Sequence, residues 1–187
     1  LYFMEKKKGT IVIFSTAYLP FLGGAETAIK GITENIDDFH FILLTSRFDK
    51  SIPRAEKDGN MIIYRLGFGN SLDKFLLPFT SFFKFNSVKK DLREPVIFWG
   101  IMASYASIGV TFLKLVYPKI PFLLTIQEGN NEWDRNSFWW RLILRKANYV
   151  TAISSFLFQK VKEAGYRGKV TIIPNGVDLN RFSPPTG

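Results

Sequence analysis

The sequence has no cysteine and a single histidine, His40, among its 187 residues. The lack of cysteine excludes disulfides, thiolate zinc sites, iron–sulfur clusters and cysteine nucleophiles. A single histidine argues against a metal site built from several histidines. We therefore expect neither a bound metal nor a prosthetic group.

Positive charge and aromatic residues are plentiful by contrast. The chain carries 25 Lys and Arg against 16 Asp and Glu, a formal net charge of +9, and 16% of its residues are aromatic. Hydrophobic residues make up 47%, too many for a disordered segment. The length suits one domain with a single sizeable core. The sequence therefore indicates one globular domain in which an excess of positive charge accompanies many aromatic rings.

We expect neither a secretory signal nor a membrane span. Residues 1–3 precede Met4 and read as the remnant of a cloning tag, so they are excluded from the fold. Residues 96–113 carry no charge over a length that just suits a transmembrane helix. However, Gly100 separates a short apolar run from a helical pattern diluted by Ser104 and Ser107. This segment is better explained by a strand followed by a helix packed under a sheet.

Apolar runs of four to six residues recur along the chain, and helical patterns lie between most of them. The runs are continuous rather than alternating, which is typical of parallel strands covered on both faces. They span residues 10–15, 40–45, 61–66, 96–99, 122–126, 149–153 and 170–173. The pattern predicts an α/β fold for residues 4–173, a Rossmann-like, doubly wound, mostly parallel sheet of about seven strands with helices on both faces. The turn-rich residues 174–187 are expected to be a linker.

Ligands of an open parallel sheet bind beyond the carboxyl ends of its strands. The first such loop ends in Gly23 and Gly24, directly before the first helical pattern. Two glycines let a ligand approach the backbone closely, and the free N–H groups of a helix N-terminus favour an anion. The same pair also suits a simple tight turn. Because the dinucleotide fingerprint G-x-G-x-x-G and the P-loop lysine motif are both absent, neither of those nucleotide-binding classes is indicated.

Three later loops reach the same predicted edge. Gln127, Glu128 and Asn130 follow the fifth run, where either a site or a solvated loop explains them. Ser154 follows the sixth run and suits an ordinary helix N-cap as well as a ligand contact. Asn175 follows the seventh run, within an Ile-Pro-Asn-Gly-Val-Asp segment.

Three of these segments resemble motifs of family 4 glycosyltransferases, which have the GT-B fold and belong to the glycosyl transferase group 1 type. Gly23-Gly24-Ala25-Glu26 is similar to the family's G-G-x-E loop. Residues 147–154 are similar to its strand that ends in serine, and residues 172–182 resemble its I-P-N-G-V-D-x-x-x-F hinge. The resemblance runs from about residue 11 to residue 182, in the family's order and approximate spacing.

This resemblance implies the N-terminal, acceptor-side half of a retaining enzyme that transfers a sugar from a UDP- or GDP-linked donor to a lipid-linked or glycan acceptor. Residues 174–187 would lead to a missing C-terminal domain that holds most of the donor, so the isolated half is expected to be inactive. The donor phosphates and the cleft are assigned Gly23, Gly24, Glu26, Ser154 and Asn175. The acceptor side is assigned Tyr18, Trp99 and Asn130.

The sequence departs from the family at Gln127, where many members carry a histidine. Glutamine forms hydrogen bonds but carries neither a proton nor a positive charge, so Gln127 is expected to position groups rather than to transfer protons. Glu128 is expected to position groups as well, with a general-base role as the alternative. The family's E-x7-E motif belongs to the missing domain. Glu26 and Glu34 have that spacing, but they lie on the first helix and we interpret the match as coincidence.

Two helical segments combine aromatic and basic residues. Residues 75–92 have two apolar sides, which favours a helix wedged into a core over one that dips into a membrane. In residues 137–147, the outer side combines apolar and basic side chains. It comprises Arg135, Phe138, Arg141, Leu142 and Arg145. Such a side suits an anionic membrane surface, although a solvated helix with scattered apolar residues is common.

These features predict a cytoplasmic protein, peripheral at the inner face of the cell membrane. A nucleic-acid partner is not expected, because no recognisable RNA- or DNA-binding motif accompanies the positive charge. The alternative to an enzyme half is a stand-alone Rossmann-type module that binds a nucleotide or phosphate without catalysis.

Overall fold

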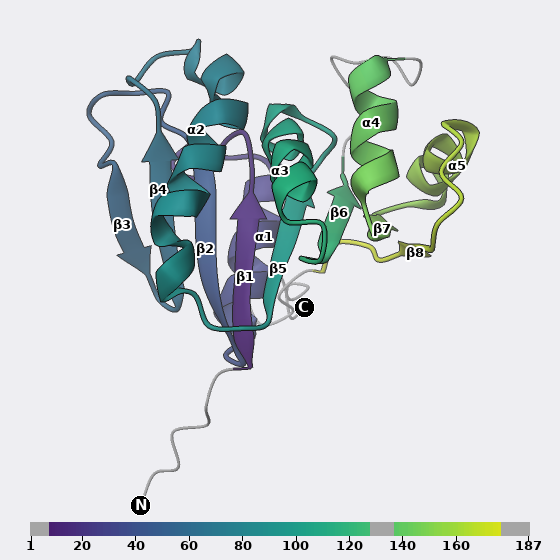
Figure 1. The fold of residues 1–187 in the computed structure, drawn as a ribbon, viewed down its shortest axis with the longest axis horizontal. Helices are drawn as coiled ribbons and strands as arrows, with labels where there is room; N and C mark the ends of the chain where they lie inside the picture. Colours follow the sequence, from purple (N-terminus) through teal and green to yellow (C-terminus); the bar gives the residue numbers. More distant parts are fainter. Residues whose placement is uncertain (1–7, 128–136, 177–187) are drawn as a thin grey trace, which may run out of the picture.

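The computed structural model describes residues 8–127 and 137–176. It contains one eight-stranded sheet with the order β3-β4-β2-β1-β5-β6-β7-β8 (Figure 1). All neighbouring strands pair in parallel except β3, which is antiparallel to β4. The strands are β1 (Gly9–Phe14), β2 (Phe39–Ser46), β3 (Ala55–Asp58), β4 (Met61–Leu66), β5 (Val96–Ile101), β6 (Phe122–Ile126), β7 (Tyr149–Ala152) and β8 (Val170–Ile172). The predicted α/β class and its mostly parallel sheet are therefore confirmed.

Each of the predicted apolar runs forms a strand, and β3 is an addition that the runs do not predict. Its sequence, AEKD, is short and polar, and its first residues are exposed. It has no apolar run because it lies at the edge of the sheet, where a strand has few buried positions.

Helices cover both faces of the sheet, but unequally. Of the described helices, α1 packs on one face, while α2, α3, α4 and α5 contribute to a larger core on the other. Figure 1 shows α1 behind the sheet and α2 and α3 in front of it. The α-helices are α1 (Gly24–Asn35), α2 (Asp73–Val88), α3 (Tyr105–Val116), α4 (Phe138–Lys146) and α5 (Ser155–Glu163), and a 3-10 turn, η1 (Lys89–Asp91), follows α2.

Right-handed crossovers explain this distribution. The connection from β1 through α1 to β2 runs in one direction along the sheet, and the later connections from β5 onward run in the other. The first core contains Ile29 of α1 with Ile13 and Leu43, whereas the second contains Val12 and Leu44 from the same two strands. Alternate residues of each central strand thus serve opposite faces.

The uncharged segment 96–113 forms strand β5 and most of helix α3, as predicted. Gly100 is needed at their contact, because a Cβ atom there would lie 2.7 Å from Ser107 Oγ and 2.9 Å from Phe122 Cε2. Within residues 8–127 and 137–176, no helix combines the length and the apolar character needed to cross a membrane.

The prediction that α2 is wedged into the core by two apolar sides is wrong. Leu77, Ser81 and Phe85 are buried against the sheet and α3, but Phe79 and Phe83 are exposed. Helix α2 lies in the outer layer of the fold, so one of its sides packs into the core while the other is largely exposed and meets only rings of α3, through Phe75 and Phe79.

Candidate functional site

The candidate site lies at the edge of the sheet where the parallel strands end. The loops that follow β1, β5, β6, β7 and β8 all leave from this edge, and these strands are consecutive neighbours in the sheet. The loops after β1 and β5 are joined directly, because Thr16 Oγ1 donates a hydrogen bond to Ser104 Oγ at 3.0 Å. The topology therefore brings together loops that lie far apart in the sequence.

Gly23 and Gly24 form the N-terminus of α1, as the sequence predicts. Gly23 is the N-cap residue and provides no side chain to cap the helix. A Cβ atom on Gly23 would lie 2.3 Å from Oε2 of Glu26, whose carboxylate is buried beside it, whereas one on Gly24 would meet no atom within 4 Å. The helix thus begins without a cap from the side chain of its N-cap residue and has room beside the Cα atom of Gly24, and a helix N-terminus of this kind favours an anion.

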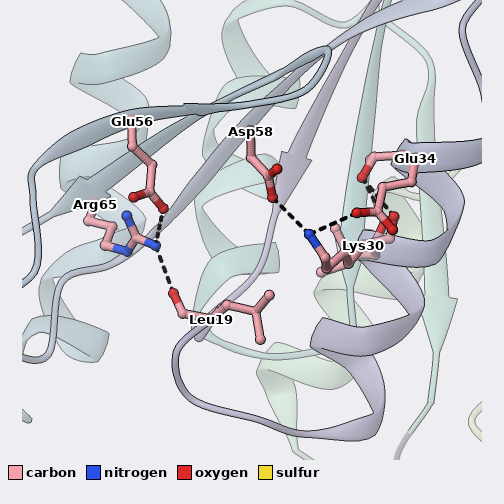
Figure 2. Close-up of polar contacts among 8 residues, drawn as sticks. Leu19, Lys30, Glu34, Glu56, Asp58 and Arg65 are labelled. Atoms are coloured by element: carbon pink, nitrogen blue, oxygen red, sulfur yellow. Dashed lines mark hydrogen bonds and ion pairs between the residues drawn. The ribbon is translucent and has the colours of Figure 1, made fainter.

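A buried arginine supports the loop that leads to these glycines. Arg65, on β4, is 4% exposed, and its Nη2 atom donates hydrogen bonds to the carbonyl oxygen of Leu19 at 2.7 Å and to Glu56 Oε1 at 2.6 Å. Figure 2 shows the guanidinium between these two partners. Because Glu56 lies on β3 and Leu19 on the loop after β1, Arg65 connects this loop to the outermost strand of the sheet.

Beside it, Lys30 of α1 forms ion pairs with Glu34 at 2.8 Å and with Asp58 of β3 at 3.2 Å (Figure 2). Hydrogen bonds to these two carboxylates raise the pKa of the Lys30 ammonium above its ordinary value. All three side chains are at least partly exposed, so the cluster fixes α1 against the edge strand rather than forming a buried reactive centre.

Tyr18, predicted on the acceptor side, lies in the core beneath α1 with 2% of its surface exposed. Its hydroxyl group has no hydrogen-bond partner among the described residues. Burial, with a smaller contribution from the charge of Asp58, raises the pKa of Tyr18 to about 12. A role for this hydroxyl in acceptor binding remains a prediction.

Trp99, also predicted on the acceptor side, is buried within the sheet face. Its Nε1 atom donates a hydrogen bond to Thr125 Oγ1 at 2.8 Å, and that oxygen shares a hydrogen bond with Thr151 Oγ1, also at 2.8 Å. This row crosses β5, β6 and β7. Its geometry gives Trp99 a structural role, and contact with an acceptor remains a prediction.

Gln127 directly follows β6, at the predicted edge. Its Oε1 atom is buried and accepts no hydrogen bond from any described residue. Ser154 follows β7 and acts as the N-cap of α5, where its hydroxyl accepts a hydrogen bond from the N–H of Leu157 at 3.3 Å. Asn175 is exposed beyond β8. The predicted residues Glu128, Asn130 and Arg135 lie outside the described residues.

The sequence reading missed a second glycine-containing turn at this edge. Asp73, at the start of α2, is fully buried and accepts hydrogen bonds from the N–H groups of Phe68 (2.9 Å), Gly69 (2.7 Å) and Asn70 (3.2 Å). In the sequence, this turn is marked by two glycines that come shortly before an aspartate at the start of a helix. Because the N–H groups of this turn already donate to the Asp73 carboxylate, they are not free to bind another anion. The turn therefore has a structural role at this edge of the sheet.

A strained residue also lies at this edge. Met102 follows β5 and has a φ of 62°, a conformation uncommon for residues other than glycine. Its N–H donates to the carbonyl oxygen of Thr125 at 2.8 Å, and its carbonyl oxygen accepts from Ser107 Oγ at 2.5 Å. These two bonds hold the turn between β5 and α3 in place beside Ser104.

The predicted outer side of α4 is found at the surface. Trp140, Ile143 and Leu144 are buried, and Phe138, Arg141 and Arg145 are exposed. A hollow on this side is lined by Phe138, Arg141, Leu142 and Arg145. Trp139 is partly exposed and packs edge-on against Phe138 and against Phe112 of α3.

Comparison with known proteins gives a family and a fold. The sequence profile of Glycosyltransferase Family 4 matches residues 22–181, which is most of the chain. No curated protein sequence matches the chain significantly.

Among solved structures, sucrose-phosphate synthase from Thermosynechococcus elongatus aligns with a TM-score of 0.75 at 15% identity, over 95% of this chain and 50% of that chain. UGT2 of Phytolacca americana, complexed with UDP-2-fluoro-glucose and pterostilbene, aligns with a TM-score of 0.57 at 10% identity, over 94% and 56%. The trehalose-6-phosphate synthase of E. coli, bound with UDP-2-fluoro glucose, aligns with a TM-score of 0.57 at 10% identity, over 92% of this chain and 50% of that chain. This chain thus spans about half the length of these proteins.

Proposed function

The chain belongs to glycosyltransferase family 4, and from this premise we propose that it is the acceptor-side half of a retaining enzyme that uses a nucleotide sugar. The donor would be UDP- or GDP-linked, and the acceptor a lipid-linked sugar or a glycan. A C-terminal domain would hold most of the donor, and the isolated half would be inactive. The proposal needs no resident cofactor or metal, because the nucleotide sugar is a co-substrate.

The observation that carries the proposal is the open N-terminus of α1. The N-cap residue, Gly23, provides no side-chain cap, and a Cβ atom on Gly24 would meet no atom within 4 Å. A donor diphosphate placed there would meet N–H donors and the positive end of the helix dipole. Such donors stabilise the negative charge that develops on the diphosphate as it leaves the sugar.

The acceptor hydroxyl would attack from the side of this domain. Gln127 lies at the same edge, and its carboxamide oxygen would accept a hydrogen bond from a sugar hydroxyl after turning out of its buried position. Gln127 and Glu128 would thus orient the reacting groups. The positioning role implies that Gln127→Ala lowers kcat about tenfold and leaves the shape of the pH–rate profile unchanged.

Nucleotide release by the full-length protein, screened with UDP- and GDP-sugars, tests the proposal. Gly24→Leu fills the space beside the helix N-terminus and should lower turnover at least about tenfold. Gly31→Leu is the matched control, because Gly31 lies on the same helix and a Cβ atom there also meets nothing within 4 Å. Nucleotide binding without turnover for every donor and acceptor tested would favour the stand-alone binding module.

The coding sequence after Gly187 provides an independent check of the domain arrangement. A second Rossmann-like half with an E-x7-E motif supports the two-domain enzyme. A stop codon soon after Gly187 contradicts it.

A further inference from the structure

Exposed aromatic rings lie on two helices on one side of the molecule. We define the aromatic face as Phe75, Phe79, Phe83, Phe138 and Trp139, which lie on α2 and α4 and are all exposed. Phe83 and Phe138 expose 70% and 69% of their surface, far more than a packed core ring does. Helices α2, α3 and α4 lie side by side over this part of the sheet (Figure 1).

The rings form a connected row rather than scattered contacts. The centroid of Phe79 lies 5.7 Å from that of Phe112 on α3, and Phe112 lies 6.4 Å from Trp139 on α4. Trp139 in turn packs edge-on against Phe138 at 5.5 Å. Three members of the aromatic face are therefore connected through Phe112, whereas exposed apolar residues that need no explanation occur singly.

The charges of the same helices have one sign. Helices α2, α3 and α4 contain a single acidic residue, Asp73, which is fully buried in its turn. Their basic residues near the surface are Lys74, Lys84, Arg141, Arg145 and Lys146. The aromatic face thus lies on helices whose surface charges are all positive.

Acidic residues gather instead on the side of α1 and β3. Glu34 lies on α1, Asp37 and Asp38 follow it, and Glu56 and Asp58 lie on β3. Figure 1 shows α1 on the far side of the sheet from α2 and α3. These acidic residues thus lie on elements other than α2, α3 and α4, together with the basic residues Lys30 and Lys57.

We propose that the aromatic face docks on a lipid bilayer that contains anionic headgroups. Aromatic side chains ringed by Lys and Arg suit the boundary between headgroups and acyl chains. Basic residues close to the surface add attraction to anionic lipids. A bilayer is a fluid partner and requires no deep pocket. This inference extends the membrane contact expected of α4 to a surface of two helices, and it does not depend on sugar transfer.

Sedimentation of the chain with vesicles tests the proposal. Vesicles of equal parts phosphatidylglycerol and phosphatidylcholine should bind the chain at low salt, and binding should fall as salt rises. Vesicles of phosphatidylcholine alone should bind at least about tenfold more weakly, because they lack the attraction to five basic side chains. Equal binding to both kinds of vesicle, or no binding to either, overturns the proposal.

Two double variants locate the surface. Arg141→Glu with Arg145→Glu should weaken binding at least about tenfold. Lys50→Glu with Lys57→Glu is the matched control, because both lysines are exposed, Lys57 lies on β3, and each double variant lowers the net charge by four. If the control weakens binding as much as the arginine variant, the attraction comes from overall charge and the docking face is wrong.

Phe79→Ser with Phe83→Ser tests the apolar part separately, and it should also weaken binding at least about tenfold. Its thermal unfolding is compared with that of the wild type, since Phe79 contacts Phe112. If the chain is a dimer that this variant dissociates, and vesicle binding is unchanged, a second copy covers the face and the proposal fails. The arginine variant keeps the test decisive if the phenylalanine variant is unstable.

Discussion

The guanidinium of Arg65 donates a hydrogen bond to the main-chain carbonyl of Leu19, 46 residues away in the sequence. The same Nη2 atom binds Glu56 of β3. One buried side chain thus joins an edge strand to the loop that ends at Gly23. The position of the α1 N-terminus therefore depends on a residue that has no place in the family motifs.

Replacing this residue should be costly. Arg65→Met should lower the free energy of unfolding by about 2 kcal/mol, because it leaves a partly buried carbonyl without its donor and Glu56 without its partner. Chemical denaturation measures the change. Arg54→Met is the control, since Arg54 is exposed and donates to the carbonyl oxygen of Gly67 at 3.0 Å. A loss as large in the control would refute the special role of Arg65.

The two glycines at the helix start should respond differently to alanine. Gly23→Ala should lower the free energy of unfolding by about 1 kcal/mol, because its Cβ displaces the buried carboxylate of Glu26. Gly24→Ala should leave stability unchanged or raise it by up to about 1 kcal/mol, since its Cβ meets no atom and alanine favours a helix. Thermal unfolding of the two single variants decides this, and equal losses would contradict the described packing.

Alkaline pH should weaken the fold through Tyr18. Its pKa is raised from 10.0 to about 12, so between these pH values the unfolded chain loses a proton that the folded chain retains. The free energy of unfolding therefore falls as pH rises through this window, by up to about 1.4 kcal/mol per pH unit from this group. Tyr18→Phe should reduce the slope. Wild-type and variant curves measured from pH 8 to pH 12 should run parallel below pH 9, and parallel curves throughout would exclude the effect.

The hydrogen-bonded row at Trp99 predicts an asymmetry between two threonines. Thr125→Val removes the acceptor of the Trp99 N–H and should cost about 1 to 2 kcal/mol, because that donor is then buried without a partner. Thr151→Val leaves the bond to Trp99 intact and should cost under about 1 kcal/mol. Urea denaturation of both variants measures the difference. A larger loss of unfolding free energy for Thr151→Val would contradict this prediction, because it would mean that the hydrogen-bonded row depends more on β7 than on the bond to Trp99.

Most of the fold could be predicted from the sequence because buried parallel strands leave continuous apolar runs. The runs placed seven of the eight strands, and the glycine pair marked the start of α1. The remaining strand, β3, is polar and pairs at an edge, so it leaves no such run. The prediction that both apolar sides of α2 pack into the core was wrong, because apolar periodicity indicates which sides of a helix are apolar but not which of them is buried.

The site was predictable only where a local pattern marks it. Ser154 caps α5 three residues before its partner, and Gly23 precedes its helix directly. By contrast, Arg65, Asp73 and the contact of Thr16 with Ser104 depend on parts of the chain that only the folded topology brings together. The roles of Gln127, Tyr18 and Trp99 in sugar transfer stay predictions.

The polar edge strand β3 also bears on how the protein behaves at high concentration. An exposed sheet edge offers unpaired N–H and C=O groups to another chain, and charged side chains on a short strand discourage that pairing. Within β3, Glu56, Lys57 and Asp58 alternate in charge, and two of them are held by Arg65 and Lys30. The ion pairs that fix this strand to the rest of the fold thus also maintain a charged border, which protects the sheet from growing into aggregates along that side.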